Sequence, residues 1–276
     1  MSKAKVNGVE IYYETKGEGF PLLMLQGFGA SSESWDQLEP RVADLSKHYM
    51  TITPDNRGTG RSSLGEGKFT VRTMADDSVA LLDELGIKKA HVLGTSFGGM
   101  ISQEIAVNYP ERVEGLVLLY TGPGGSTFDY PGQRAAIEKM SWFSAPPKGM
   151  SPEAVMDAVL KLVYYRPWLE ANLSRIMATS AKYPTSTEAF ARQYEALIGF
   201  DATRRLNRIL AETLIIHGED DAAIFPASAR FMARQIGGAE LWMLGEAGHC
   251  LSEERWGEVR VIVLGFLAGV DKRRSD

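Results

Sequence analysis

The sequence predicts an α/β fold: a mostly parallel, doubly wound sheet of about eight strands, with an N-terminal antiparallel hairpin and an inserted α-helical cap. Three observations lead to this prediction. Short apolar runs alternate along the chain with stretches of helical periodicity. Most of these runs are continuous rather than alternating, which is typical of parallel strands buried on both faces. The alternation stops once, between Thr121 and about Leu210, and then resumes.

The hairpin is predicted at the N-terminus. Residues 9–15 are rich in β-forming side chains, and Asn7-Gly8 separates them from Lys5-Val6. Asn-Gly favours the tight turn whose twist matches that of two antiparallel strands. The chain is therefore expected to enter the sheet through an antiparallel edge, before the parallel strands begin.

Buried strands and the helices between them follow in regular order. The apolar run Pro21–Leu25 is the first such strand, and later ones are expected at residues 49–53, 91–93, 113–120, 213–217 and 239–244. Helical spacing predicts helices at residues 31–45, 71–85, 100–109, 227–236 and from about 252 onward. Ser252, Glu253 and Glu254 are expected to cap the last helix and to complement its dipole. This order of strands and helices builds a parallel sheet with helices on both faces.

The interruption after the 113–120 strand has a different composition. It contains Gly-Pro and Pro-Pro breaks, many large apolar side chains, and helical patterns near residues 132–143, 152–164, 168–181 and 187–200. A structureless loop of this length is unusual in a compact domain, whereas a helical cap over a cleft explains both its length and its apolar content. We expect a core domain of residues 1–121 and 211–276, and a cap of residues 122–210.

Composition excludes several classes of function. The chain has 276 residues and a net charge of −5, with no basic stripe to meet phosphates, so nucleic-acid binding is not expected. The single cysteine, Cys250, excludes an intrachain disulfide, and no apolar run reaches the ~18 residues of a membrane span. The N-terminus lacks a secretory pattern, so we expect a cytoplasmic protein. Neither metal-ligand spacing nor a dinucleotide-binding motif is present, so no cofactor or metal is indicated.

One short motif is specific enough to predict chemistry. Gly94-Thr-Ser-Phe-Gly98 fits the pattern Gly-x-Ser-x-Gly, with a buried strand before it and a helix after it. In that context the serine sits on a strained turn, with its hydroxyl exposed above the sheet. The following helix points its N-terminal amides at the serine, where negative charge develops during acyl transfer. The motif therefore predicts that Ser96 is a nucleophile.

Two further loops at strand ends hold the residue types that activate a serine. Ligands bind at the carboxyl ends of parallel strands, so these loops are expected to meet at the same edge. His249 follows the last strand and would be the base, since imidazole titrates near neutral pH. The acid is expected in the loop after the preceding strand, where Glu219, Asp220 and Asp221 are the candidates. The chain order Ser, Asp, His is the one that accompanies a nucleophile elbow.

Taken together, these motifs closely resemble those of the α/β-hydrolase family over nearly the whole chain. The matching segments are Gln26–Gly29, Asp55–Ser62, Gly94–Gly99, Gly218–Asp221 with Pro226, and Gly248-His249. The resemblance implies a catalytic triad of Ser96, Asp221 and His249, and an oxyanion hole made by the backbone N–H groups of Phe28 and Phe97. It favours Asp221 because the family's acid stands at the third position after the strand-ending glycine.

The chain departs from the family pattern at Gln26, where the family usually has a histidine that braces the oxyanion loop. The amide of Phe28 remains, so the oxyanion hole is expected to survive. Gln26 offers both a hydrogen-bond donor and an acceptor, and is predicted to be the substitute brace. It is also a candidate pocket residue, together with Trp142, Tyr164 and Trp168 of the cap.

The predicted function is hydrolysis of a carboxylic ester or lactone through an acyl-enzyme. The apolar cap suggests a hydrophobic small-molecule substrate of small to medium size. Family members with this triad also act as C–C bond hydrolases or enol-lactonases of aromatic degradation, as amidases similar to proline iminopeptidases, or as receptors without turnover, and these remain alternatives. The first two need a cation for a substrate carboxylate, for which Arg166, Arg175 and Arg192 are candidates. The sequence is compatible with a homo-oligomer but does not define one.

Two other conspicuous features are interpreted as structural. The Gly-rich segment Asp55–Ser62 follows a strand and is expected to satisfy loop amides and to close that end of the sheet. Cys250, next to the histidine, is expected to be a small buried hydrophobic residue rather than a second nucleophile.

Overall fold

The structure is a computed structural model that describes residues 2–179 and 181–275. Its strands are β1 (Ser2–Val6), β2 (Val9–Lys16), β3 (Pro21–Leu25), β4 (Met50–Pro54), β5 (Ala90–Thr95), β6 (Val113–Leu119), β7 (Glu212–Gly218) and β8 (Glu240–Leu244). They form one sheet in the order β1-β2-β4-β3-β5-β6-β7-β8. Strand β2 pairs antiparallel with β1 and β4, and the other neighbouring strands pair in parallel. The predicted fold class is confirmed.

The N-terminal hairpin forms as the Asn-Gly pair predicts. Val6 pairs with Val9 across the turn, and both turn residues have positive φ, 46° at Asn7 and 77° at Gly8. Two successive residues in this region define the turn type that matches the twist of the flanking strands. The turn therefore sets the register in which β1 meets β2.

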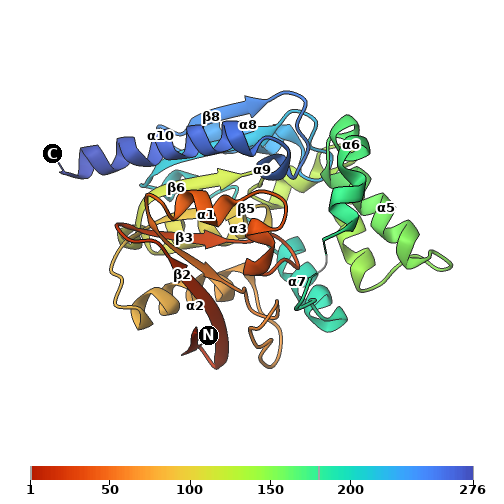
Figure 1. Cartoon of the computed structure of the whole chain (residues 1–276), viewed down its shortest axis with the longest axis horizontal. Helices are drawn as coiled ribbons and strands as arrows, with labels where there is room; N and C mark the ends of the chain where they lie inside the picture. Colours follow the sequence, from red (N-terminus) through yellow and green to blue (C-terminus); the bar gives the residue numbers. More distant parts are fainter. Residues whose placement is uncertain (1, 180, 276) are drawn as a thin grey trace.

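Helices cover both faces of the sheet (Figure 1). Outside the segment between β6 and β7 they are α1 (Arg41–Leu45), α2 (Val71–Glu84), α3 (Phe97–Asn108), α8 (Pro226–Gln235), α9 (Leu251–Glu254) and α10 (Trp256–Ser275). Along β3, Leu23 and Leu25 belong to the apolar cluster shared with α2, α3 and α8. Leu22 and Met24 belong to the cluster shared with α1 and α10. Side chains alternate between the two faces of a strand, so a strand buried on both faces needs a continuous apolar run.

Two predicted helices are each divided in the structure. The helix expected at residues 31–45 is a 3₁₀ turn, η1 (Ser32–Asp36), followed by α1, because Pro40 lies between them and cannot donate a helical hydrogen bond. The last helix is divided into α9 and α10 at Arg255. The expected cap by Ser252 is wrong: Cys250 occupies the N-cap of α9 without a side-chain hydrogen bond. The Ser252 hydroxyl instead bonds Tyr120 and Arg41.

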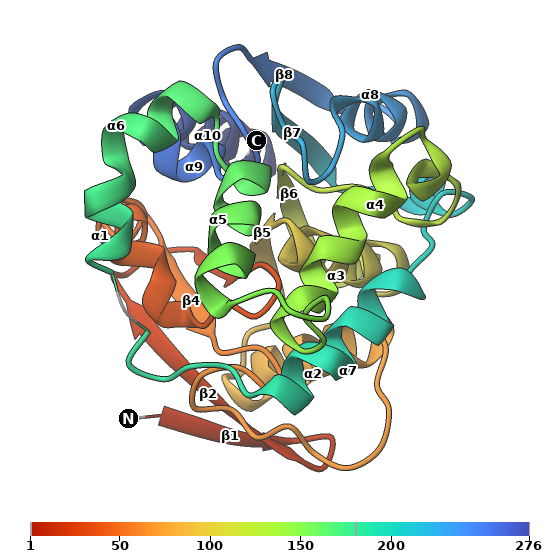
Figure 2. The same ribbon diagram turned by 90° about the vertical axis from the view of Figure 1, so that its right-hand side faces the viewer.

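Residues 122–210, here called the β6–β7 segment, lie at the carboxyl ends of the strands. The segment contains α4 (Gln133–Glu138), α5 (Pro152–Val163), α6 (Arg166–Met177) and α7 (Thr187–Ile198), and the 3₁₀ turns η3 (Gly125–Asp129), η4 (Lys139–Phe143) and η5 (Leu206–Arg208). Figure 2 shows α4 to α7 in front of the strand ends. In its described part, 122–179 and 181–210, the segment has no strand, only an isolated bridge between Gly124 and Asp201.

The β6–β7 segment packs onto the rest of the chain through apolar contacts. Leu160, Leu169 and Ile176 form a cluster with Leu38, which precedes α1. Ala136 and Leu162 form another with Ala223, from the loop after β7.

None of the helices within the described ranges combines the length and apolar character that crossing a membrane requires.

Candidate active site

Ser96 stands on a strained turn between β5 and α3. Its backbone has φ 49° and ψ −117°, in a region that residues with a β-carbon rarely adopt. The Ser96 amide donates to the Leu119 carbonyl at 3.0 Å, and its carbonyl accepts from the Thr121 hydroxyl at 2.6 Å. These bonds to the end of β6 hold the serine in a conformation that its local sequence would not choose alone.

The two glycines of the motif are required by close packing. A β-carbon on Gly98 would lie 2.1 Å from the Leu25 carbonyl oxygen, and one on Gly94 would lie 2.4 Å from the Gly98 carbonyl oxygen. Both distances are far shorter than a van der Waals contact, so α3 can lie this close to β3 and β5 only with glycine at both positions. The spacing Gly-x-Ser-x-Gly is therefore a packing requirement of the turn.

The structure brings Ser96, His249 and Asp221 together in one hydrogen-bonded chain. His249 Nε2 lies 2.8 Å from Ser96 Oγ, and His249 Nδ1 lies 2.8 Å from Asp221 Oδ2. Asp221 and His249 are buried, and Ser96 is partly exposed. The alternative acids lie outside this chain: Asp220 is exposed, and Glu219 pairs with Arg230 on the surface.

Asp221 is held so that it stays ionised. Its Oδ1 accepts from the amides of Ala223 at 2.9 Å and Ile224 at 2.8 Å, and its Oδ2 also lies 3.0 Å from His217 Nε2. Burial alone would raise the pKa of Asp221, but attraction to His249 and hydrogen bonds from His217 and His249 outweigh it and lower the pKa to about 2. An ionised Asp221 accepts a hydrogen bond from the Nδ1–H of His249, which leaves Nε2 free to accept a hydrogen bond from the serine.

His217 is a neighbour of Asp221 that sequence analysis placed only within a strand. Its side chain is fully buried, and Nε2 also lies 2.7 Å from the Ile224 carbonyl oxygen. A carbonyl oxygen can only accept, so His217 carries its proton on Nε2. His217 therefore donates to groups of the turn that contains Asp221. No short sequence motif predicts this contact.

The loop after β3 lies against the serine. A β-carbon on Gly27 would be 3.3 Å from Ser96 Cβ, so glycine allows the close approach. Among the residues that the structure describes, the Phe28 amide has no acceptor. Phe97 is the first residue of α3, and the first amides of a helix have no partner within the helix. Neither amide is thus engaged by an acceptor within the described residues, and the oxyanion hole of Phe28 and Phe97 stays a prediction.

Gln26 braces this loop from within. Its Oε1 accepts from the Gly27 amide at 3.0 Å and from the Thr95 hydroxyl at 2.9 Å, and its Nε2 donates to the Ser34 hydroxyl at 2.8 Å. Both ends of the amide are therefore bonded within the protein. The loop that lost the family's usual histidine is tied to β5 and to η1 by this side chain.

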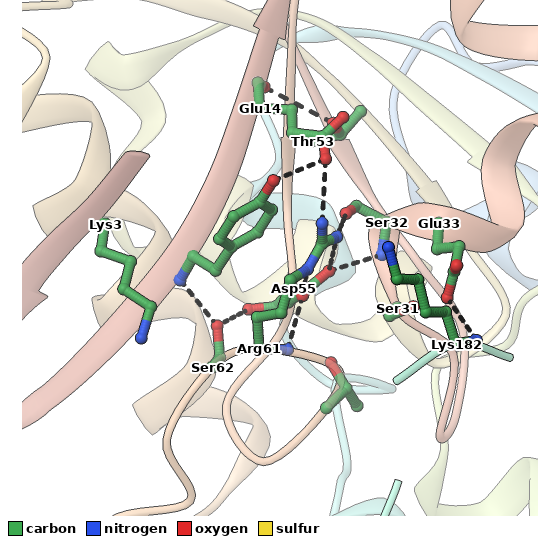
Figure 3. Close-up of polar contacts among 12 residues, drawn as sticks. Lys3, Glu14, Ser31, Ser32, Glu33, Thr53, Asp55, Arg61, Ser62 and Lys182 are labelled. Carbon is green, nitrogen blue, oxygen red and sulfur yellow. Dashed lines mark hydrogen bonds and ion pairs between the residues drawn. The ribbon is translucent and has the colours of Figure 1, made fainter. Parts of the chain in front are cut away.

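The Asp55–Ser62 loop closes the neighbouring strand end (Figure 3). Asp55 Oδ1 accepts from the Ser32 amide at 2.7 Å. Its Oδ2 accepts from the Arg61 amide at 2.8 Å and from Arg61 Nε at 2.9 Å. Asn56 Nδ2 donates to the Gln26 carbonyl at 3.0 Å, which joins this loop to the one beside the serine. These contacts agree with the structural interpretation of the segment.

Glu254 holds the loop that carries His249. Its Oε2 accepts from the Gly248 amide at 2.8 Å and its Oε1 accepts from the Tyr165 amide at 3.0 Å. Burial raises the pKa of Glu254, although these two backbone donors oppose the shift. Glu254 lies in the first turn of α9, as expected for a residue that complements the helix dipole, and it also holds this loop. A glutamate five positions after a histidine has no recognised local pattern, so the sequence alone did not reveal this role.

The β6–β7 segment touches the histidine loop at a second point. The Cys250 amide donates to the Val163 carbonyl at 2.8 Å. Burial raises the pKa of the Cys250 thiol well above its usual value, so the thiolate that a nucleophile needs is disfavoured. This agrees with the interpretation of Cys250 as structural. Within the described residues, no group of three or more His, Cys, Asp or Glu side chains is arranged so that it could hold a metal ion.

The predicted pocket residues of the β6–β7 segment occupy two separate places. Trp142 lines a cavity of about 270 Å³ with Phe143 and other apolar residues. Phe143 stacks on Phe190 at 5.0 Å between ring centroids, and Phe190 lies 5.5 Å from the ring of Phe28. This cavity is thus linked by aromatic contacts to the loop beside Ser96.

Tyr164 and Trp168 stack on each other, at 5.2 Å and 17°. They pack on the apolar cluster of Leu38, Leu160, Leu169 and Ile176, and the Tyr164 hydroxyl donates to Glu253. Their contacts are therefore with the interface between the β6–β7 segment and the region of α1.

The three arginines that could bind a substrate carboxylate are engaged with acidic side chains. The pairs are Arg166 with Glu170, Arg175 with Glu39, and Arg192 with Glu188. Arg175 also donates to the Leu38 carbonyl, and Arg192 donates to the carbonyls of Gly65 and Gly67. Arg166 and Arg192 thus pair with glutamates on their own helices. Arg175 and Arg192 also bond backbone carbonyls outside the β6–β7 segment.

Comparison with known proteins agrees with the fold. The family model described as alpha/beta hydrolase fold matches residues 21–144. A protein of Pseudomonas savastanoi pv. phaseolicola, named as a proposed carbamate hydrolase RutD, is 31% identical over 237 residues, which are 83% of this chain and 86% of the relative. The 2-hydroxymuconate semialdehyde hydrolase of Pseudomonas sp. strain CF600 is 29% identical over 273 residues, 96% of this chain and 92% of the relative.

A solved structure extends the comparison. The crystal structure of the enol-lactonase from Burkholderia xenovorans LB400 superposes with a TM-score of 0.83 at 28% identity, covering 97% of this chain and 100% of that chain. The chain belongs to the α/β-hydrolase family.

Proposed function

We propose that this protein hydrolyses a carboxylic ester or lactone with Ser96 as nucleophile, His249 as base and Asp221 as the orienting acid. The observation that carries the proposal is the hydrogen-bonded chain from Ser96 Oγ through His249 to Asp221 Oδ2, with both links at 2.8 Å. These distances lie within hydrogen-bond reach, which a base needs in order to take the proton of its nucleophile.

Acylation uses the chain in one direction. His249 Nε2 removes the hydroxyl proton as Ser96 Oγ attacks the carbonyl carbon, and the carbonyl oxygen becomes an oxyanion. The amides of Phe28 and Phe97 donate hydrogen bonds to that oxyanion. When the tetrahedral intermediate collapses, the protonated His249 gives its proton to the leaving alkoxide. The alcohol departs, and the acyl group remains on Ser96.

Deacylation repeats these steps with water. His249 takes a proton from a water molecule as its oxygen attacks the acyl carbon, and the same two amides hold the second oxyanion. The bond to Ser96 Oγ then breaks, and Ser96 recovers its proton from His249. The ionised Asp221 stabilises the imidazolium in both halves without taking its proton.

Residues 122–210 are proposed as a cap domain over this site, and residues 1–121 and 211–276 as the catalytic core domain. The cavity lined by Trp142 is apolar, and its aromatic wall continues through Phe190 to Phe28. The three cap arginines that could hold a carboxylate are occupied by acids. Both features favour a neutral, hydrophobic acyl group of small to medium size over an anionic one.

The names of the relatives supply the alternatives for the test. They include a carbamate hydrolase, a semialdehyde hydrolase and an enol-lactonase. A carbamate, a C–C bond substrate with a carboxylate, and an enol-lactone are therefore set beside simple esters, saturated lactones and a proline amide.

The experiment is a comparison of initial rates over this panel for the wild-type protein and for Ser96→Ala. We expect the highest kcat/KM for a neutral ester or lactone, and background rates for Ser96→Ala. Higher kcat/KM for the anionic C–C substrate would replace the proposed substrate class. Equal background rates for both proteins on every substrate would indicate a receptor without turnover.

A further inference from the structure

Two glutamines of the β6–β7 segment are completely buried, and each bonds a loop beside the proposed site. Gln133, on α4, and Gln193, on α7, are both 0% exposed. Each uses its amide oxygen to accept from a backbone N–H and its amide nitrogen to donate to a backbone carbonyl. A buried amide is costly unless both ends are bonded, so these partners are well defined.

The two glutamines bond different loops. Gln133 accepts from the Phe225 amide at 2.7 Å and donates to the Ala223 carbonyl at 2.6 Å, in the turn that follows Asp221. Gln193 accepts from the Gly29 amide at 2.9 Å and donates to the Arg57 carbonyl at 3.1 Å. Only the second of these glutamines reaches the loop of Phe28, one residue from the proposed oxyanion donor.

The β6–β7 segment holds both backbone polar atoms of Gly29. In addition to the bond from its amide to Gln193, its carbonyl accepts from the Thr185 hydroxyl at 2.7 Å. Phe190 closes the remaining space, since a β-carbon on Gly29 would lie 2.1 Å from that ring. With φ 67°, Gly29 also has a backbone conformation that a side chain would strain.

These contacts fix the peptide group that contains the Phe28 amide. The Gly27 amide is bonded to Gln26 on one side of it, and the Gly29 amide is bonded to Gln193 on the other. The Gly27 carbonyl, which shares a rigid plane with the Phe28 N–H, accepts from Ala30 at 3.2 Å. The direction of the Phe28 N–H therefore depends on support from both segments of the chain.

We propose that Gln193 is a positioning residue for the oxyanion hole: from the β6–β7 segment it fixes the loop that presents the Phe28 amide. The inference rests on the proposed function, because it assigns the Phe28 amide to the oxyanion. It makes the β6–β7 segment part of the catalytic alignment as well as a cover over the site. A donor misplaced by about 1 Å can cost about 100-fold in rate, so the expected effect is measurable.

The test compares Gln193→Met with Gln133→Met on the best ester from the panel. Methionine keeps the length and burial of glutamine but makes neither hydrogen bond. Gln133→Met is the matched control, since it removes the same two kinds of bond from an equally buried glutamine at another loop. For each variant we measure kcat, KM, the pH dependence of kcat, and the inhibition constant of a trifluoromethyl ketone, which forms a hemiketal oxyanion on the serine.

For Gln193→Met we expect kcat to fall about 10- to 100-fold with KM within about threefold of wild type. The inhibition constant should rise by the same factor, because the bound hemiketal uses the same hole. The pH midpoint of kcat should stay in place, because the bonds of His249 and Asp221 are untouched. In Gln133→Met, any loss of kcat should come with a displaced midpoint.

Three outcomes would overturn the inference while leaving the proposed function in place. One is a kcat for Gln193→Met within threefold of wild type. Another is a loss of kcat in Gln193→Met that comes with a displaced pH midpoint of kcat, as expected for Gln133→Met. That result would indicate a general loosening of the structure around the site. If Gln193→Met does not fold, Thr185→Val tests the same loop through its carbonyl, and an unchanged kcat there has the same meaning. Background rates in Gln193→Met with an active Ser96→Ala would instead overturn the proposed function, and the inference with it.

Discussion

The α/β core and the β6–β7 segment contribute to the site in different ways. The core supplies the proposed reacting groups, which stand on loops at the ends of β3, β5, β7 and β8. The segment supplies backbone and amide partners for three of those loops: Gln193 for Gly29, Gln133 for the Asp221 turn, and Val163 with Tyr165 for the His249 loop. The proposed reacting groups thus come from the core alone, whereas their alignment depends on both parts of the chain.

The two kinds of contribution should differ in the size of their effect on rate. Substitution of a proposed reacting group in the core should remove the reaction. Substitutions at the contacts between the core and the β6–β7 segment, here called the joints, should slow the reaction or change its dependence on substrate size. Covalent and proton-transfer groups act as a unit, so the loss of one removes nearly the whole effect. When a supporting hydrogen bond is removed, the buried donor or acceptor that loses its partner costs about 1–3 kcal/mol.

The largest effect is expected for Ser96→Ala. Without the hydroxyl no acyl-enzyme can form, so kcat on the best ester should fall roughly 10⁴- to 10⁶-fold. Steady-state turnover measures it, with thermal unfolding to establish that the variant is folded. Retention of more than a tenth of the wild-type rate would remove Ser96 from the mechanism.

Asp221→Asn should be next, with kcat/KM lower by roughly 10³- to 10⁴-fold. The asparagine amide can donate to His249 Nδ1, which stabilises the tautomer that cannot accept the serine proton. Asp220→Asn is the matched control, because Asp220 is the exposed neighbour on the same turn. An inactive Asp220→Asn with an active Asp221→Asn would reverse the assignment of the acid.

Acid should destabilise the core through the same carboxylate. The pKa of Asp221 is lowered to about 2 in the folded protein, below the ~3.9 of an unfolded aspartate. Its contribution is therefore complete above pH ~5 and is lost progressively as the pH falls from about 5 to about 1, an effect of about 2–3 kcal/mol. Urea unfolding of wild type and Asp221→Asn should give free energies that converge over this range. Parallel pH profiles would contradict the lowered pKa.

A joint between the two parts should give a smaller effect. In Glu254→Gln, one of the amides of Gly248 and Tyr165 loses its acceptor and faces an NH₂ group instead. The His249 loop should loosen, and kcat should fall roughly tenfold. Glu258→Gln, which alters an exposed pair with Arg255 on α10, is the control. Equal rates in the two variants would show that the His249 loop does not depend on this joint.

The smallest effect is expected inside the β6–β7 segment. Trp142→Ala enlarges the apolar cavity next to Phe143 and removes ring contacts. We expect KM to rise about three- to tenfold for esters with longer acyl chains and to change little for acetates. Trp242→Ala, at a half-exposed tryptophan of β8, is the control. A KM effect that does not depend on acyl length would exclude this cavity as an acyl site.

Local patterns predicted the parts of the molecule that local geometry determines. The elbow at Ser96 could be predicted because its glycines, its strand and its helix are contiguous in the sequence. The continuous apolar runs predicted buried strands because each must satisfy two faces of the sheet. The single helix expected over residues 31–45 is too long because its apolar spacing continues across Pro40, whereas in the structure η1 ends at Asp36 and Pro40 is the N-cap residue of α1.

The joints could not be predicted in the same way. Gln193 bonds Gly29, 164 positions away, and Glu254 bonds Tyr165, 89 positions away. When two residues are this far apart in the sequence, no local pattern predicts that they will bond. A glutamine in a helix is by itself more typical of a solvent-exposed position. Gln26 was an exception, because its departure from a familiar motif drew attention to what the loop needs.

The distance along the chain between Ser96 and His249 has a consequence for biosynthesis. These residues are separated by 153 positions, so Ser96 leaves the ribosome well before His249, its proposed base. At 5–20 residues per second the interval is roughly 10–30 s. During that time the elbow can be formed while the hydroxyl has no group to take its proton. We expect a nascent chain to be hydrolytically silent until its last strand and helix are in place.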